Sequence, residues 1–462
     1  MDTNVFRQIP KMDILLQRPA VIEAAGDLPR PLIKRAVQGV LDALRQTLAD
    51  GGALPEESAL DRQLTDAIRA AGALRLRRVI NATGVVLHTN LGRAPLGSAV
   101  AGHVADVAAG YSTLEYDLDA GTRGSRHDLV ERQLCRLTGA EAAMVVNNNA
   151  AAVFLMLHTL ASGKKVAVSR GELVEIGGAF RVPEIMAASG AELLEIGTTN
   201  KTHAADYEAA LAQENVAALL KVHTSNFAII GFSESVDLSS LSQMAADHGV
   251  PLLYDLGAGF LVRPEQLGLH EGVYVPDAVK LADVCCFSGD KLFGAGQAGI
   301  LLGKADLIGR MKRDQLARML RVDKMTLASV EAALRLYEDP ALAAAEIPAL
   351  SMLSASAEEL KTIAEALAAD LCRTCGGDWF TAVPCTDEPG GGSLPTVQLP
   401  GWAVCAEIPG MRPDALEAAL RALPTPVIGR ICKGHLLLSV RTLLPDDRAA
   451  LLAAMADLEV KA

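Results

Sequence analysis

The stretch FSGDKLFGA, residues 287–295, places a lysine directly after an apolar run that favours a β-strand. The predicted strand covers residues 282–287, and Lys291 follows in a short polar turn that leads into glycines. An amine attacks an aldehyde only when it is unprotonated, so a reactive lysine needs a dry, crowded site that disfavours its charged form. Many pyridoxal-phosphate enzymes present their Schiff-base lysine in this way, although the letters SGDK alone fit a solvated lysine equally well.

Short apolar runs alternate with helical patterns on both sides of this stretch, from about residue 79 to residue 330. Seven of them are predicted strands: residues 142–146, 165–169, 192–196, 217–223, 251–256, 282–287 and 299–302. Stretches with helical character, such as residues 150–160 and 238–248, lie between most of them. This alternation predicts a doubly wound, mostly parallel α/β sheet, which binds ligands at the carboxyl ends of its strands.

The two ends of the chain have a different character, so three domains are expected. Residues 1–70 show helical periodicity, with Ile33, Val37 and Leu41 among the regularly spaced apolar positions, and should form a small helical domain. Residues 71–335 should form the large catalytic domain. Residues 336–462 should form a smaller α+β domain, with a helix at 356–371, a Pro/Gly-rich loop at 388–393 and strands at 396–399, 402–407 and 435–440.

Composition limits the classes of protein to which the chain can belong. Its 462 residues exceed what a single hydrophobic core usually supports. No apolar run approaches the ~18 residues that a bilayer requires, and the N-terminus lacks a signal pattern, so no membrane partner and a cytoplasmic location are expected. The formal net charge of −12 argues against indiscriminate binding of DNA or RNA, although basic clusters exist locally.

The eight cysteines do not form a disulfide framework in a chain of this length. Cys285 and Cys286 lie in the strand before Lys291 and are expected in the core. Cys372 and Cys375 form a CxxC motif, but no second close pair completes a tetrahedral site. We therefore expect no metal, and the role of this CxxC motif is left open.

Asn147, Asn148 and Ala150 follow the first predicted strand and begin a helix. Amides at a helix N-terminus favour an anion, and small residues let the backbone approach a phosphate closely. This segment is therefore a candidate phosphate site, although an asparagine-rich helix cap without a ligand explains the same pattern.

Asp255 ends another predicted strand and is followed by glycines. A carboxylate at this place can pair with the nitrogen of a pyridine ring and keep that nitrogen protonated, so that the ring acts as an electron sink. The alternative interpretation is that Asp255 is an ordinary turn residue. Only one strand separates Asp255 from Lys291, which predicts that both lie at neighbouring strand ends. Ser288 could donate its hydroxyl to the phosphate, and the basic glycine loop at residues 121–126 is expected to line the mouth of the site.

These motifs, in this order, resemble the bacterial selenocysteine synthase family, the L-seryl-tRNA(Sec) selenium transferases. The resemblance covers essentially the whole chain, including the helical N-terminal extension. It is carried by NATGVVLHTNLGRA at 81–94, YSTLEY at 111–116, AGTRGSR at 120–126, VVNNNAAAV at 145–153, SRGELVEIGGAFR at 169–181, KVHTSNF at 221–227, DLGAG at 255–259, FSGDKLFGAGQAG at 287–299 and GGGSLP at 390–395.

The resemblance implies a fold-type I pyridoxal-phosphate enzyme, similar in fold to aspartate aminotransferase. It implies conversion of L-seryl-tRNA(Sec) to L-selenocysteinyl-tRNA(Sec) with selenophosphate, through a cofactor-bound aminoacrylyl-tRNA intermediate. The family's Schiff-base lysine falls on Lys291 and its adjacent acid on Asp290. Lys291 is then placed to remove the Cα proton, while Asp290 either carries a proton or orients Lys291.

Selenophosphate is a small multivalent anion, so arginines should grip its oxygens. Family positions for this task match Arg93, Arg318 and Arg321. Arg318 and Arg321 are three residues apart and are expected to share one helical face, for which a solvated face is the alternative explanation.

Two larger binding surfaces are also implied by the resemblance. The N-terminal domain, with Arg30, Lys34 and Arg35, would hold the tRNA body by salt-sensitive phosphate contacts, unless these residues form an ordinary solvated helix face. The family assembles into a ring-shaped homodecamer of dimers, in which Arg93 acts in its own or in a neighbouring subunit's site.

Two other functions compete with this interpretation. A pyridoxal-phosphate lyase or desulfurase acting on a free small amino acid or amino sugar would also use Lys291 and Asp255, but it would not need the basic N-terminal helices. A non-catalytic tRNA-binding scaffold would not need Lys291 intact.

Three details are left open by the sequence. They are the residue that stacks on the pyridine ring, the features of the tRNA that are read, and the role of two C-terminal arginines. The candidates for stacking are His127, Arg170 and Glu172. For Arg430 and Arg441 a structural salt bridge is favoured over binding of a substrate carboxylate.

Overall fold

The computed structural model describes residues 8–176 and 180–456 and separates into two compact units, Met1–Arg78 and Val79–Ala462. Residues 177–179, which belong to the motif quoted at 169–181, and the two chain ends lie outside the described residues. Each unit has a hydrophobic core of its own.

The first unit is a small bundle built from α1 (Met12–Leu15), α2 (Pro19–Ala25), α3 (Arg30–Ala49) and α4 (Glu57–Gly72). Val37, Leu41 and Leu44 of α3 are buried with residues of α4, and Ile33 is partly buried against them. The periodicity of the sequence therefore places the apolar face of α3 correctly. The expected boundary at residue 70 falls inside α4, because the helix continues to Gly72.

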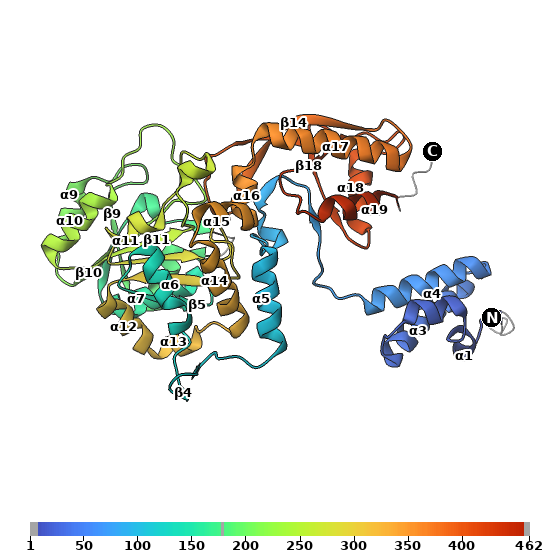
Figure 1. Ribbon diagram of the computed structural model, residues 1–462, viewed down its shortest axis with the longest axis horizontal. Coiled ribbons are helices and arrows are strands. Elements are labelled where there is room, and N and C mark those ends of the chain that lie inside the picture. The colour runs from blue at the N-terminus through green and yellow to red at the C-terminus, as the bar shows by residue number, and fades with distance from the viewer. Residues whose placement is uncertain (1–7, 177–179, 457–462) are drawn as a thin grey trace. The chain divides into compact units, whose positions relative to one another are not determined.

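The second unit contains a seven-stranded sheet in the order β5-β13-β12-β11-β10-β6-β9 (Figure 1). Its strands are β5 (Ala142–Val146), β6 (Lys165–Ser169), β9 (Glu192–Ile196), β10 (Val216–Val222), β11 (Leu252–Gly257), β12 (Val284–Ser288) and β13 (Gly299–Gly303). Only β13 runs antiparallel to its two neighbours within this sheet. The predicted mostly parallel sheet is confirmed, and the ends of each of the seven strands predicted for it lie within two residues of the observed ones.

Helices cover both faces of this sheet, as a doubly wound fold requires. Tyr254 and Cys285 point into one core, which includes residues of α6 (Asp128–Thr138), α10 (Leu238–His248) and α14 (Lys324–Leu336). Leu253 and Cys286 point into the opposite core, with residues of α7 (Asn149–Ala161), α8 (Val182–Ser189) and α12 (Ala305–Arg313). Further helices around the sheet include α5 (Ser98–Ala109), α9 (Ala204–Leu211), α11 (Val275–Val279) and α13 (Gln315–Met319).

The C-terminal part of the second unit is a five-stranded sheet in the order β17-β18-β15-β14-β2. The strands are β2 (Val85–Leu87), β14 (Phe380–Gly390), β15 (Leu399–Ala406), β17 (Arg430–Cys432) and β18 (His435–Ser439). Helices α17 (Ala357–Cys375), α18 (Pro413–Ala422) and α19 (Asp447–Ala456) contribute to the core against one of its faces. This sheet and its helices agree with the α+β character expected of the C-terminal region.

The expected boundaries at residues 71 and 335 differ from the structure at both ends. β2 joins the C-terminal sheet beside β14, and β1 (Ile80–Asn81) pairs with β16 (Val427–Ile428), so an early segment of the chain belongs to this late sheet. At the other end, α15 (Pro340–Glu346) and α16 (Pro348–Ser354) bury Ala343 and Leu350 in the core of the large sheet. Strand pairing and core packing, rather than position in the sequence, therefore decide where the large domain begins and ends.

Two local predictions for the C-terminal region are wrong. Residues 388–390 of the expected Pro/Gly-rich loop form the end of β14, because they hydrogen-bond to β2. Residues 396–398, expected in a strand, precede β15 in irregular structure.

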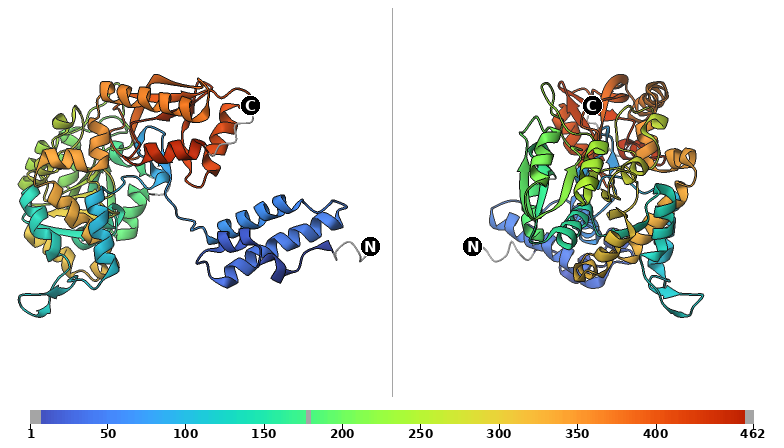
Figure 2. Two further views of the ribbon diagram at one scale, coloured as in Figure 1. Left: turned by 45° about the vertical axis from the view of Figure 1, so that its right-hand side comes forward. Right: turned by 90° about the vertical axis from the view of Figure 1, so that its left-hand side faces the viewer.

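A hairpin of β3 (Tyr116–Asp117) and β4 (Thr122–Arg123) projects from the second unit, as Figure 2 shows. Tyr116 and Leu118 of this hairpin are exposed. Among the described residues, no helix combines the length and the apolar character that crossing a bilayer would need.

Candidate active site

Lys291 lies just beyond the carboxyl end of β12, in a turn that is buried on all sides. The turn is closed by the amide of Gly289, which donates to the carbonyl of Ala298, and Leu292 and Phe293 bury its far side. Lys291 is 5% exposed, and its Nζ makes one long contact, 3.4 Å from the Gly392 carbonyl. Burial lowers the pKa of the Lys291 ammonium, Arg93 lowers it further, and Asp255 and Asp290 oppose the shift. The site thus favours the neutral, nucleophilic amine.

Asp255 lies at the end of β11, the strand that pairs with β12, so the predicted juxtaposition with Lys291 is confirmed. Its carboxylate is buried, and this burial raises its pKa. Hydrogen bonds to the carboxylate act in the opposite direction, because they favour the ionised form. Oδ1 accepts hydrogen bonds from Asn149 Nδ2 at 2.8 Å and from the Gly257 amide at 2.9 Å. The hydrogen bonds of this carboxylate with the described residues all go to Oδ1, which leaves Oδ2 for the cavity that Asp255 lines.

The N-terminus of α7 lies beside Asp255. Asn148 caps this helix by accepting the Ala151 amide at 2.8 Å, which leaves the first-turn amides of Asn149 and Ala150 open to an anion. Asn148 and Ala150 line the cavity, as does Ser288, the last residue of β12. Asn147, also a candidate for cofactor binding, is exposed, does not line this cavity, and donates its backbone amide to the Leu320 carbonyl.

Arg93 comes from the 3-10 turn after β2 and reaches the same cavity. It has φ of 64°, an unusual value for a residue other than glycine, and its Nη1 is 2.7 Å from Asp290 Oδ2. Strained backbone of this kind is retained where the surrounding structure needs the side chain in one place. Arg93 and Asp290 therefore lie together in this chain's own site.

Two cavities meet at Lys291. The inner one has a volume of about 290 Å³ and is lined by Lys291, Asp255, Arg93 and the start of α7. The outer one, about 530 Å³, is lined by Lys291, Arg93, Ser225 and residues 388–398. Gly392 lines the outer cavity with φ of 79°, and a Cβ at this position would lie 2.8 Å from Lys291 Nζ. The glycine run at 390–392 thus leaves room for the lysine side chain.

Sequence reasoning missed several residues of these cavities. Asn149, Phe180, Gln297 and Ser225 line one or the other. All four lie in the quoted family motifs, but nothing in those motifs alone assigned them to the site. None of the three residues considered for ring stacking lines either cavity, whereas Phe180 lines the inner one.

The three residues considered for stacking have other contacts. Glu172 is 2.8 Å from Lys221 Nζ in a buried ion pair, because both project from neighbouring strand ends. Arg170 is paired with Glu195. Burial lowers the pKa of His127, and its Nδ1 has no partner among the described residues.

Arg318 and Arg321 line neither cavity of this chain. Arg318 is exposed on α13, which ends at Met319. Arg321 lies beyond the helix, where its backbone bridges to Val146, and its side chain is 3.9 Å from Glu115. The expectation that both arginines share one helical face is therefore wrong, because the chain extends again before Asp323 caps α14.

The glycine loop at residues 121–126 also fails to line the cavities. It lies in the projecting β3–β4 hairpin, and Arg126 is held by Glu115 and by the Val322 carbonyl. The local turn is as expected, but its position relative to the active site is not.

The C-terminal arginines are structural. Arg441 is buried and donates to Asp387 Oδ2 at 3.0 Å, and Arg430 is 3.2 Å from Asp387 Oδ1. The favoured salt bridge is confirmed. Cys285 and Cys286 are buried in the core as expected, and the Cys372 thiol faces the Phe380 carbonyl.

Comparison with known proteins identifies the family. A family model described as L-seryl-tRNA selenium transferase matches residues 79–444, and one described as selenocysteine synthase N terminal matches residues 6–45. The chain belongs to the L-seryl-tRNA(Sec) selenium transferase family. Relatives of that description from Geobacter metallireducens and Geobacter sulfurreducens are 47% and 45% identical, over 98% of this chain and 99% of each relative.

The structures agree with this assignment at the level of the fold. The solved structure of D-glucosaminate-6-phosphate ammonia-lyase has a TM-score of 0.57 and 20% identity, covering 82% of this chain and 96% of the other. The selenium transferase is a fold-type I pyridoxal-phosphate enzyme that converts seryl-tRNA(Sec) to selenocysteinyl-tRNA(Sec). Pyridoxal phosphate is the cofactor that the family and the fold imply.

The residues of the inner cavity fit pyridoxal phosphate. A buried amine of lowered pKa can hold its aldehyde, and the buried Asp255 carboxylate can pair with its ring nitrogen. The start of α7 offers amide donors for its phosphate. Two further buried polar atoms, Asn149 Oδ1 and Ser225 Oγ, have no hydrogen-bond partner among the described residues, which is unusual unless a ligand supplies one.

The Arg93→Ala substitution should raise the pH at which Lys291 reacts. It removes a positive charge that lowers the lysine pKa and frees the Asp290 carboxylate, which raises it. At any pH below the lysine pKa the neutral fraction then falls, so the pH midpoint for capture of pyridoxal phosphate by the apo-protein should move upward. Stopped-flow absorbance measures the rate of capture at each pH, from which the midpoint follows. Arg93→Lys keeps the charge and should stay near the wild-type midpoint; an equal displacement in both variants would contradict the charge effect.

Proposed function

We propose that selenophosphate is the selenium donor of this selenium transferase and that Lys291 and Arg93 act together in the reaction. The observation that carries the proposal is that a buried amine of lowered pKa and a half-buried arginine line the same two cavities. The amine can react at the amino-acid end of the tRNA, and the guanidinium group of the arginine can donate two parallel hydrogen bonds to an anion.

Lys291 is proposed to carry the cofactor and to move the protons of the reaction. Pyridoxal phosphate, when bound, supplies an electron sink for the carbanion at Cα. When it does not hold the coenzyme, Lys291 Nζ would be free to act as the general base that removes the Cα proton of the seryl ester. The resulting ammonium then gives a proton to the departing β-hydroxyl, which leaves as water.

Asp290 is proposed as a positioning residue. Its carboxylate is 2.7 Å from Arg93 and only 12% of its side chain is exposed. An ion pair so placed keeps Arg93 directed into the cavity before the anion arrives. Once selenophosphate binds, Arg93 is shared between Asp290 and the anion's oxygens, which holds the selenium near Cβ.

The reaction itself tests the proposal. Holoenzyme is incubated with seryl-tRNA(Sec) and selenophosphate, and the aminoacyl product is identified by mass spectrometry. Seryl-tRNA(Ser) and free serine serve as controls. We expect selenocysteinyl-tRNA from seryl-tRNA(Sec) only. Turnover of free serine at a comparable rate would favour a lyase instead, and a product formed with selenide but not selenophosphate would refute the assigned donor.

The first unit is proposed to bind the body of the tRNA. Arg30, Lys34 and Arg35 are exposed on the first two turns of α3 and make no ion pair with the described residues. Solvated, unpaired cations on a rigid helix suit contacts with a phosphate backbone. Because aminoacyl-tRNAs are made and used in the cytoplasm, we also propose a cytoplasmic location.

Replacing Arg30, Lys34 and Arg35 together by alanine should weaken binding of seryl-tRNA(Sec). The slope of log affinity against log salt should become shallower by roughly one for each phosphate group that the variant no longer neutralises. Filter binding over a range of salt concentrations measures both quantities. Arg45→Ala is the matched control on the same helix, because Arg45 is already paired with Asp42. An unchanged salt slope in the triple variant would exclude these residues from the tRNA interface.

We further propose that Arg318 and Arg321 serve the site of a neighbouring subunit in a homo-oligomer, for which a decameric ring of dimers is our expectation. Both are exposed and line neither cavity of their own chain. Exposed arginines of this kind can complete an anion site only across an interface.

Mixed oligomers should reveal such sharing. Lys291→Ala and Arg318→Ala subunits are each expected to be nearly inactive alone with selenophosphate. Co-expressed with different affinity tags and purified as hybrids, they should regain roughly a quarter to a half of the wild-type rate, because some sites combine an intact Lys291 with an intact Arg318. Hybrids as inactive as their parents would place Arg318 in the site of its own chain or outside the reaction.

A further inference from the structure

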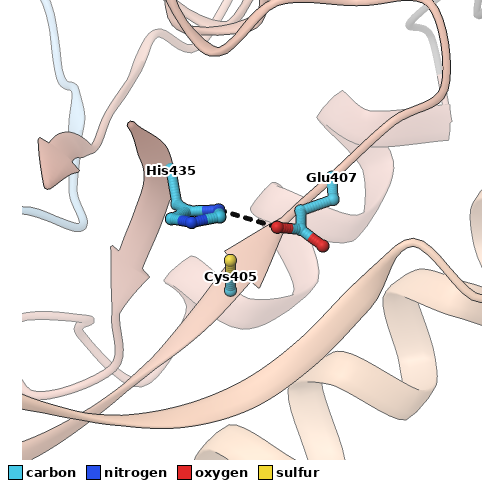
Figure 3. A group of neighbouring side chains, drawn as sticks. All are labelled: Cys405, Glu407 and His435. Atoms are coloured by element: carbon cyan, nitrogen blue, oxygen red, sulfur yellow. Dashed lines mark ion pairs between the residues drawn. The ribbon is translucent and has the colours of Figure 1, made fainter. Parts of the chain in front are cut away.

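Three metal-binding types of side chain meet on one face of the C-terminal sheet. Cys405 lies near the end of β15, Glu407 follows that strand, and His435 begins the neighbouring β18 (Figure 3). The register pairs Cys405 with Leu437 and Ala406 with Leu436, so Glu407 and His435 are the next opposing pair. Alternation along both strands therefore directs all three side chains to the same face.

The three donor atoms are already close together. His435 Nδ1 is 2.7 Å from Glu407 Oε1, and the sulfur of Cys405 completes a group whose ligand atoms all lie within 4.8 Å of one another. Cys405 is only 7% exposed, whereas the side chains of His435 and Glu407 are 52% and 60% exposed. The thiol is therefore the buried member of the group, and the imidazole and the carboxylate are its solvent-exposed members.

The backbone holds this arrangement in place. β18 lies between β15 and β17 in the sheet, so His435 is not on an edge strand. His435 leaves a tight hairpin in which Lys433 and Gly434 both have positive φ, 51° and 82°. Such two-residue turns fix the register of the strands that they join, and with it the position of the imidazole.

We propose that Cys405, Glu407 and His435 bind a zinc ion, with water in the remaining position. Sulfur, imidazole nitrogen and carboxylate oxygen are the three donors that zinc takes in proteins, at about 2.3, 2.0 and 2.0 Å. Tetrahedral geometry at these lengths separates the donor atoms by about 3.3–3.6 Å. The His435–Glu407 contact must therefore open by about half an ångström, which two half-exposed side chains permit.

An ordinary surface ion pair explains only part of this geometry. Glu407 and His435 would make the same contact above any small residue at position 405, and a paired imidazole and carboxylate do not require a sulfur beneath them. The thiol lies within reach of both partners on a rigid sheet, far along the chain from the cofactor-binding turn. This triad is the one group of its kind found among the described residues.

Metal binding by the full-length holoenzyme tests the proposal. After chelator treatment, the protein is titrated with Co²⁺ as a coloured substitute and with Zn²⁺ in competition. We expect one ion per chain and a thiolate-to-cobalt charge-transfer band in the difference spectrum. Cys405→Ser should abolish the band, and His435→Gln should weaken binding by about tenfold or more, since even the loss of residues that only support ligands costs this much.

Cys432→Ser is the matched control, because Cys432 is an exposed thiol directly opposite His435 on β17 but is not part of the triad. It should keep both the band and the affinity. Thermal unfolding without metal should be alike in all variants, and Zn²⁺ should raise the unfolding temperature of wild type and of Cys432→Ser alone. Binding that survives in Cys405→Ser, a band lost in Cys432→Ser, or the absence of a stoichiometric ion would each overturn the proposal.

Discussion

Lys291→Ala should lower the rate of selenocysteinyl-tRNA formation by about 10³-fold or more, since one side chain supplies both the amine for the cofactor and the general base. The substitution removes a buried amine whose one hydrogen bond to the described part of the chain is the long one to the Gly392 carbonyl, so the packing around it should change little. Binding of seryl-tRNA(Sec) should stay close to the wild-type value. Single-turnover assays and filter binding measure the two quantities separately.

Lys304→Ala is the control for this variant. Lys304 is an exposed lysine that pairs with Asp283 near the opposite end of the same strands, and its removal should leave turnover unchanged. Borohydride treatment followed by intact-mass analysis should fix the coenzyme to wild type and to Lys304→Ala but not to Lys291→Ala. A coenzyme fixed at another lysine, or an equal loss of tRNA binding and turnover, would contradict the assigned role.

Asp255→Asn should reduce turnover by roughly 10²–10³-fold, the usual cost of removing one preorganised electrostatic partner. Oδ1 of asparagine can still accept from Asn149 and Gly257, so the local hydrogen bonds survive. What disappears is the negative charge next to the ring nitrogen. The coenzyme should still bind, and the loss should appear in the rate of Cα proton removal, which deuterated seryl-tRNA reports.

The same substitution should not destabilise the apo-protein. Burial raises the pKa of Asp255 above its unfolded value, so this carboxyl group lowers stability as the pH rises from the unfolded-state pKa through the folded-state pKa. Asparagine removes this cost, and the apo-protein of the variant should unfold at the same or a higher temperature at neutral pH. Asp283→Asn, a change near the other end of the sheet, should retain full turnover. A clear fall in the apo-protein's unfolding temperature would show that the activity loss reflects misfolding.

Much of the site could be predicted because it depends on strand ends. Lys291, Asp255 and Asn148 each follow an apolar run that becomes a strand of one sheet, and parallel strands bring their carboxyl ends to one edge. The types of residue at those strand ends then indicate which chemistry the site can perform. Asn149 and Gly392 escaped notice because their roles depend on residues about a hundred positions away.

The errors have a common physical origin. The loop at residues 121–126 is a glycine-rich turn, as its sequence indicates, but it projects from the unit, and nothing local to the loop specifies that direction. Arg318 and Arg321 are separated by a helix end that a backbone bridge to Val146 imposes. β2 joins a sheet whose other strands come some three hundred residues later.

The sequence by itself determined the order of strands and helices, the buried faces, and the lysine, aspartate and asparagine that line the inner cavity. These follow from periodicity and residue type, which act over a few neighbouring positions. Only the tertiary structure decided which residues meet across the chain: Arg93 with Asp290, Gly392 with Lys291, and Cys405 with His435. Such pairings arise from sheet register and core packing, whose energies depend on segments that are distant in sequence and adjacent only after folding.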